Sequence, residues 1–153
     1  MTDDVDEAFM RLAYEEAMRA RSMGEVPVGA VLVGNDSDII SRAHNLCETS
    51  FDPTAHAEII AIREAAKKYQ SIRLNQSTIY VTLEPCSMCI GAIVLARLKR
   101  LVYAADDPKS GAVVSNYNIG SDGRLNHIVE VSRGVMEREC AQLLRDFFQG
   151  LRG

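Results

Sequence analysis

The sequence predicts an α/β fold in three layers (α/β/α), with a mixed five-stranded sheet and helices on both faces. Two observations lead to this prediction. Two β-prone runs flank Gly34-Asn35-Asp36, which is typical of a hairpin turn. After this hairpin, β-prone runs alternate with segments of helical spacing, and parallel strands need such helical crossovers.

The first three elements are a helix and the two strands of the hairpin. Apolar residues recur at helical spacing from Asp6 to about Met23, and Gly24 then ends the helix. Val26–Val33 is rich in β-branched residues and predicts the first strand. Ile39–Ala43 has the pattern of the second strand, so the chain is expected to fold back on itself here.

The middle of the chain is predicted to contain two helices around one strand. Asp52-Pro53-Thr54 has the chemistry of a helix start, and apolar spacing extends that helix to about Tyr69. Ser77–Leu83 is strongly β-prone. Pro85 then opens a helix that extends through Leu95, which gives a strand followed directly by a helix.

The last elements are two strands and a helix. Leu101–Ala105 predicts a fourth strand, which a loop containing Asp106–Gly111 follows. Ile128–Val131 is a possible fifth strand, and the final helix is expected from about Val135 to Phe148. No repeat or linker divides the chain, so one domain is expected over residues 1–153.

Composition excludes several classes of protein. A hydrophobic content of 47% with 25% charged residues is ordinary for a globular fold and too apolar for disorder. The longest apolar runs, Val26–Gly34 and Met88–Ala96, span nine residues each, about half of a membrane span. An acidic N-terminal segment is unlike a secretory signal, so we expect a cytoplasmic protein with reduced cysteines and no membrane association.

Three side chains have the spacing and position of metal ligands. Cys86 and Cys89 lie three residues apart at a helix start, so their sulfurs share one face, and the helix dipole favours thiolates. A lone C-x-x-C is also typical of a redox dithiol, half of a structural zinc site or two core cysteines. His56 begins a helix after a neighbouring strand, so both helix starts are expected at one edge of the sheet.

Three protein ligands and a water are typical of catalytic zinc, whereas a structural zinc site has four protein ligands. No spacing ties a fourth ligand to the other three, so core or surface roles are the default for the remaining candidates. These candidates are His44, Cys47, His127 and Cys140.

Glu58 is a candidate general acid and base. Residues two apart on a helix face different ways, so Glu58 is poorly placed to bind the metal that His56 holds. It can instead reach a metal-bound water and carry its proton to a leaving group. The alternative is a first-turn carboxylate that only stabilises the helix dipole.

The His56-Ala57-Glu58 and Pro85–Cys89 segments carry the H-x-E and P-C-x-x-C signature of zinc-dependent cytidine and nucleoside deaminases. Further segments resemble the bacterial tRNA-specific adenosine deaminase family over about residues 8–152. These segments are Gly24–Ala30, Asn45, Asp52–Glu58, Tyr80–Cys86, Ala105–Gly111, Asn126-His127 and Phe147-Phe148. The resemblance implies a cytidine deaminase-like fold and a homodimer.

The resemblance also implies a reaction. One zinc ion per subunit, on His56, Cys86 and Cys89, would hold a hydroxide that attacks C6 of the wobble adenosine in a tRNA anticodon. Glu58 would move the proton to the ring and then to the amine, which leaves inosine and ammonia. The target base has to be splayed out of the anticodon loop before it can react.

Seven residues are candidate substrate contacts by this resemblance: Asn45 for the flipped base, and Asp107, Lys109, Asn126, His127, Phe148 and Arg152 for the anticodon stem-loop. Each has a structural alternative. Phe147 and Phe148 could be core residues, and Lys109 and Arg152 could be solvated charges. Asn126-His127 could cap a turn.

Two other functions stay open. The zinc motifs are shared with deaminases of free guanine or cytosine, which the acidic net charge of −4 also fits. A zinc or RNA-binding module without catalysis is the third possibility. Residues 1–76 hold 8 basic and 13 acidic side chains, and residues 77–153 hold 9 and 8, so the acidity lies outside the half with most of the candidate RNA contacts.

Overall fold

The computed structural model describes residues 2–152, so the two end residues of the expected 1–153 domain lie outside it. It contains one five-stranded sheet in the order β2-β1-β3-β4-β5. In chain order the elements are α1 (Thr2–Ser22), β1 (Gly29–Val33), β2 (Ile39–His44), α2 (Cys47–Ser50), α3 (Ala57–Tyr69), β3 (Thr78–Leu83), α4 (Ser87–Leu95), β4 (Arg100–Ala105), β5 (Glu130–Arg133) and α5 (Glu137–Arg152).

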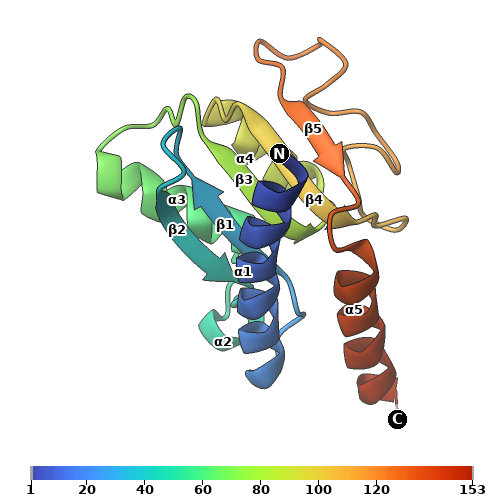
Figure 1. Cartoon of the computed structure of the whole chain (residues 1–153). Helices are drawn as coiled ribbons and strands as arrows, with labels where there is room; N and C mark the ends of the chain where they lie inside the picture. Colours follow the sequence, from blue (N-terminus) through green and yellow to red (C-terminus); the bar gives the residue numbers. More distant parts are fainter. Residues whose placement is uncertain (1, 153) are drawn as a thin grey trace.

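The three-layer α/β/α architecture is confirmed. Figure 1 shows α1 in front of the sheet and α3 and α4 behind it, with α5 continuing beyond the edge at which β5 ends. Alternate residues of the strands face the two helical layers. Leu32 and Ile79 belong to the core cluster with α3 and α4, whereas Val31 and Tyr80 belong to the cluster with α1 and α5.

The hairpin explains why two helices start side by side. Strands β2 and β3 are both antiparallel to β1, so β2 and β3 run in the same direction. The helices that follow them, α3 and α4, therefore begin at the same edge of the sheet, which we call the site edge. The predicted meeting of the two helix starts is confirmed by this topology.

The helix predicted from Asp52 begins later, at Ala57. The side chain of Asp52 accepts hydrogen bonds from the backbone N–H and the hydroxyl of Thr54, at 2.8 and 2.7 Å. These local bonds make Asp52-Pro53-Thr54 a turn rather than a helix cap. The turn separates the short helix α2 from α3 and leaves His56 at the N-cap position of α3.

The C-terminal third also differs from the prediction. Strand β5 lies at Glu130–Arg133, two residues beyond the expected span, and α5 extends to Arg152. Strands β4 and β5 are parallel, yet residues 106–129 join them without a helix or strand. This segment carries the chain from the site edge to the opposite edge of the sheet.

No helix within residues 2–152 is both long and apolar enough to cross a membrane.

Candidate active site

The structure brings His56, Cys86 and Cys89 together at the site edge. Their three ligand atoms lie within 4.8 Å of one another. His56 Nδ1 is 3.7 Å from Cys86 Sγ and 3.4 Å from Cys89 Sγ. Tetrahedral zinc, with Zn–S of about 2.3 Å and Zn–N of about 2.0 Å, requires an N-to-S separation of about 3.6 Å, so the three side chains fit zinc.

Helix geometry presents these ligands. His56 and Cys86 are the N-cap residues of α3 and α4, and neither makes a side-chain capping bond. Their side chains are therefore directed to the space between the two helix starts. Cys89 lies one turn into α4 and is fully buried, so its sulfur returns to the same space.

The electrostatics of the cluster favour a thiolate. A hydrogen bond from the Cys89 thiol and the neighbouring His56 lower the pKa of Cys86 to about 4. The bond to Cys86 also raises the pKa of His56, although burial opposes this change. An anionic sulfur beside a histidine nitrogen is the donor chemistry that Zn²⁺ binds.

Glu58 shares a cavity of about 250 Å³ with His56 and Cys86. Its side chain is buried, and burial raises its pKa to about 7. A carboxyl group with a pKa near neutrality can both accept and donate a proton. The cavity therefore places a proton carrier beside the three candidate ligands.

Asn45 lines the same cavity from the end of β2. Its amide oxygen accepts a hydrogen bond of 2.8 Å from the backbone N–H of Ala57, the first residue of α3. Asn45 therefore caps the helix that carries Glu58, in place of His56. Because the oxygen is engaged, the NH₂ group is the part of Asn45 that a substrate can use.

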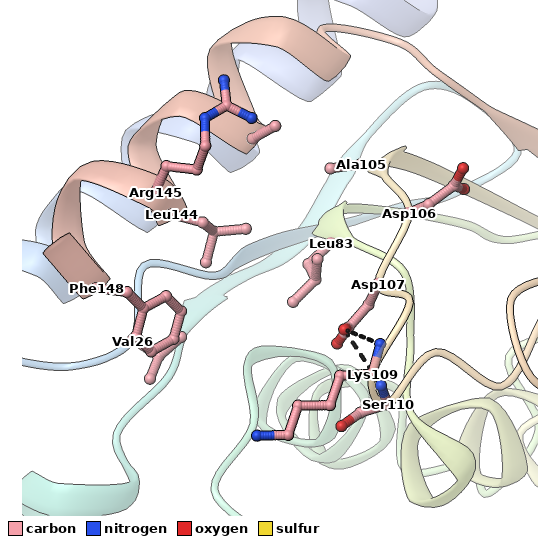
Figure 2. A pocket seen from close by; sticks show the side chains of 11 residues that line it. Val26, Leu83, Ala105, Asp106, Asp107, Lys109, Ser110, Leu144, Arg145 and Phe148 are labelled. Carbon is pink, nitrogen blue, oxygen red and sulfur yellow. Dashed lines mark hydrogen bonds between the residues drawn. The ribbon is translucent and has the colours of Figure 1, made fainter.

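A second cavity of about 480 Å³ adjoins the first and shares Val26, Leu83, Asp107 and Ser110 with it. Figure 2 shows Leu144, Arg145 and Phe148 of α5 on one side of this groove and the Asp107–Ser110 loop on the other. The ring of Phe148 is 43% exposed and Lys109 is exposed. The core alternative is therefore wrong for Phe148.

Asp107 lines both cavities and also organises its own loop. Its side chain accepts hydrogen bonds from the backbone N–H groups of Lys109 and Ser110, at 3.1 and 3.2 Å (Figure 2). Asp107 therefore shapes the loop that presents Lys109 to the groove. Arg152, near the end of α5, is exposed and does not line this groove.

The structure separates Asn126 and His127 from the other candidates. Asn126 accepts a hydrogen bond of 2.9 Å from Arg97, and His127 Nε2 lies 2.7 Å from the carbonyl oxygen of Leu98. Leu98 precedes β4, whereas the site edge is where β4 ends. The strand length between these points is about 17 Å at ~3.3 Å per residue.

The four candidates for an additional metal ligand lie apart from the cluster. His44 bonds to Glu16 at 2.8 Å, and Cys140 is buried in the core under α1. His127 is at the opposite edge, as described above. Cys47 lines the cavity that contains Glu58, but its sulfur is directed to the carbonyl oxygen of Pro53 at 3.9 Å.

Two buried glutamates at the cavity were not singled out from the sequence. Glu25 accepts hydrogen bonds from the backbone N–H groups of Glu48 and Thr49 and so holds α2 at the cavity. Glu84 holds the loop after β4 in a similar way. In the sequence, each glutamate lies close to a proline beside an apolar strand. Glu25 lies two positions before Pro27 and precedes its strand, and Glu84 lies directly before Pro85 and follows its strand.

Proteins that are similar to this chain in sequence are deaminases. The MafB19-like deaminase family model matches residues 4–152. The tRNA-specific adenosine deaminase of Haemophilus influenzae is 52% identical over 95% of this chain and 84% of its own length. The enzyme of the same name from Bacillus subtilis is 50% identical over 96% of this chain and 91% of its own length.

Solved structures agree with these relatives. One, from a study of A-to-I editing by tRNA:A34 deaminases at the wobble position, is 46% identical with a TM-score of 0.86, over 90% of this chain and 99% of that one. A guanine deaminase from Bacillus subtilis is 33% identical with a TM-score of 0.62, over 78% of this chain and 86% of that one. Cavity, ligands and identity together place the chain: it belongs to the tRNA-specific adenosine deaminase family, within the MafB19-like deaminases.

Proposed function

We propose that this enzyme hydrolyses the 6-amino group of the wobble adenosine in a tRNA anticodon and leaves inosine. The observation that carries the proposal is the cavity that the buried Glu58 shares with His56 and Cys86, two members of the His56-Cys86-Cys89 cluster, beside a groove with an exposed aromatic ring. The 52% and 50% identical relatives are both tRNA-specific adenosine deaminases, which supports the RNA substrate.

We further propose that His56, Cys86 and Cys89 hold one zinc ion per subunit. The spacing of their donor atoms and the low pKa of Cys86 support this metal. When bound, zinc lowers the pKa of a coordinated water towards 7 and supplies a nucleophile at neutral pH. The redox-dithiol alternative for Cys86 and Cys89 does not explain the approach of His56.

The protein's own groups then move the protons. Water adds its oxygen to C6 of adenine, and Glu58 takes the proton that the water loses and delivers it to ring N1. Glu58 then takes the remaining proton of the added hydroxyl group and passes it to the amine, and the C6–N bond breaks as C6=O forms and ammonia leaves. The NH₂ group of Asn45 donates a hydrogen bond to the base edge and holds C6 in line with Glu58.

The groove would hold the nucleotides next to the target. Recognition of single-stranded RNA commonly stacks splayed bases on aromatic rings, and Phe148 presents such a ring. Lys109 and Arg145 on the two sides of the groove can neutralise phosphates. Arg152, at the exposed end of the same helix, is proposed to contact the stem or loop backbone.

A homodimer would reconcile the two sets of candidate RNA contacts. Asn126 and His127 lie at the edge opposite the cavity, and a second subunit would bring its copies of them to an anticodon loop bound at this cavity. Exposed apolar side chains adjoin them: Leu125 is 45% and Ile128 60% exposed. Light scattering of active protein should give twice the chain mass, and a fully active monomer would contradict this assembly.

The decisive test is inosine formation in RNA. Zinc-loaded protein is incubated with an anticodon stem-loop that carries adenosine at the wobble position and with a matched stem-loop that carries guanosine there. Inosine is expected in the first RNA, with one ammonia released per inosine. Free guanine, cytosine and adenosine are assayed in parallel, and activity on a free base without activity on RNA overturns the proposal. We place the reaction in the cytoplasm, where tRNA serves translation.

A further inference from the structure

We propose that Glu84 is a positioning residue for RNA binding, because it fixes the loop from Asp107 to Ser115 to the turn that carries the zinc ligands. This role rests on the proposed deamination of a tRNA anticodon. Glu84 follows the last residue of β3 and lies two positions before Cys86, and its side chain is 2% exposed. It lines the same cavity as His56 and Glu58.

Both carboxylate oxygens of Glu84 are filled by donors from one loop. Oε2 accepts hydrogen bonds from the backbone N–H groups of Val113, Val114 and Ser115, at 3.1, 2.8 and 2.9 Å. Oε1 accepts from the N–H of Asp107 at 2.9 Å and from the hydroxyl of Ser115 at 2.5 Å. A single buried carboxylate therefore replaces the regular secondary structure that residues 107–115 lack.

The hydrogen bonds continue from Glu84 to the groove. The backbone of Asp107 is held by Glu84, and its side chain in turn holds the N–H groups of Lys109 and Ser110. Those two residues line the groove beside Phe148. The orientation of Lys109 toward bound RNA therefore depends on the carboxylate of Glu84.

Two further contacts tie this loop to the zinc-ligand turn. The N–H of Ala112 donates a hydrogen bond of 2.9 Å to the carbonyl oxygen of Pro85, the residue before Cys86. Gly111 packs against Glu84 so closely that an added Cβ would collide with its carboxyl group. These two contacts join the groove loop to Glu84-Pro85, directly before Cys86.

A positioning role and a catalytic role of Glu84 would change the kinetics in different ways. Glu84 is directed to the loop rather than to the reacting base, and a loosened loop removes RNA contacts that are equally strong in the ground state and the transition state. Loss of such uniform binding raises KM and leaves kcat unchanged. A residue that acted through the zinc turn would instead lower kcat and the zinc content.

The test is the Glu84→Gln variant on the anticodon stem-loop, with the zinc-loaded full chain. Glutamine keeps the shape but places an NH₂ group against backbone donors, so at least two hydrogen bonds are lost whichever way it is turned. KM is expected to rise about 10- to 100-fold, with kcat within about threefold of the wild type. Zinc content should stay at one per chain.

Two comparisons make the result specific. In the Glu84→Gln background, Lys109→Ala should raise KM much less than it does in the wild type, because the two changes act on one loop. Asp6→Asn removes another buried carboxylate, which binds Arg100 and Tyr80 at the opposite edge. It should lower Tm without a change in KM.

Gly111→Ala provides a second variant in case Glu84→Gln does not fold. The added methyl group would collide with the carboxyl group of Glu84 and with the backbone oxygen of Asp107, so it separates the loop from a carboxylate that keeps its charge, and KM should rise in the same direction. An unchanged KM in both variants, additive effects with Lys109→Ala, or a loss of zinc and kcat at constant KM each overturns the role of Glu84. Absence of inosine formation in the wild type would instead reject the proposed function itself.

Discussion

At the scale of single residues, Glu58 separates chemistry from metal binding. The carboxylate lies in the cavity with two of the three candidate ligands but is not part of the ligand cluster. Glu58→Gln should therefore retain zinc and lower kcat by about 10²- to 10⁴-fold, the usual range for loss of a general acid and base. Metal analysis beside single-turnover inosine formation measures both quantities, and loss of zinc in this variant would make Glu58 a ligand.

The cluster of candidate metal ligands could be predicted from the sequence because helical spacing relates Cys86 to Cys89 and the strand order brings the two helix starts to one edge. Cys86 and Cys89 are one helical turn apart at the start of α4. His56 lies at the start of α3, which begins at the same edge of the sheet. The role of Glu84 could not be predicted in this way. Its hydrogen-bond partners Asp107 and Ser115 are 23 and 31 positions further along the chain, and only the folded loop brings them near.

At the scale of elements, an ion pair between the buried Asp6 and the partly exposed Arg100 attaches α1 to the sheet. Arg100 at the start of β4 donates two hydrogen bonds to Asp6, at 2.8 and 2.7 Å, and Tyr80 of β3 donates a third at 2.8 Å. Burial opposes ionisation of Asp6, but the bonds from Arg100 and Tyr80 outweigh it and lower the pKa of this carboxyl group. The charged form of Asp6 should therefore stabilise the contact between the N-terminal part of α1 and strands β3 and β4.

The sign of the pH dependence follows from that lowered pKa. Asp6 contributes stability above the pKa of the unfolded chain, about 3.9, and this contribution is lost as the pH falls towards the lower folded pKa. Asp6→Asn should cost about 3 kcal/mol at pH 7 because it leaves Arg100 without its partner. Urea unfolding at pH 7 and pH 3 measures the effect, which should be smaller at pH 3; an equal loss at both values would contradict it.

Element types were predictable and some element ends were not. The hairpin and the helices α3 and α4 follow from strong periodicity and turn residues. The sequence predicts the start of α3 too early because the side chain of Asp52 accepts the hydrogen bond of the Thr54 N–H within a local turn. The parallel pair of β4 and β5 without a helix between them has no local signature, since Glu84 rather than a helix organises part of the connection.

At the scale of the whole molecule, the charge distribution predicts weak dependence of RNA binding on salt. The net charge is −4, and the groove and the end of α5 offer three cations, namely Lys109, Arg145 and Arg152. Three phosphate contacts on a single strand give a slope of about −2 for log K against log salt concentration. This slope is measured by fluorescence anisotropy with an anticodon stem-loop, over a salt range of about 50 to 200 mM. A slope steeper than about −5 would require more cations than the groove and the end of α5 offer and would contradict this prediction.

The placement of His56 and Cys86 at two helix N-caps has a consequence for folding. These residues are 30 positions apart, and a metal that joins them would cross-link the two ends of the segment that contains α3 and β3. A cross-link of this span removes about 3–4 kcal/mol of chain entropy from the unfolded state. The ion that serves the reaction is thus expected to hold the second helical layer together as well, so an inactive Glu58→Gln protein should still melt at a lower temperature after chelation.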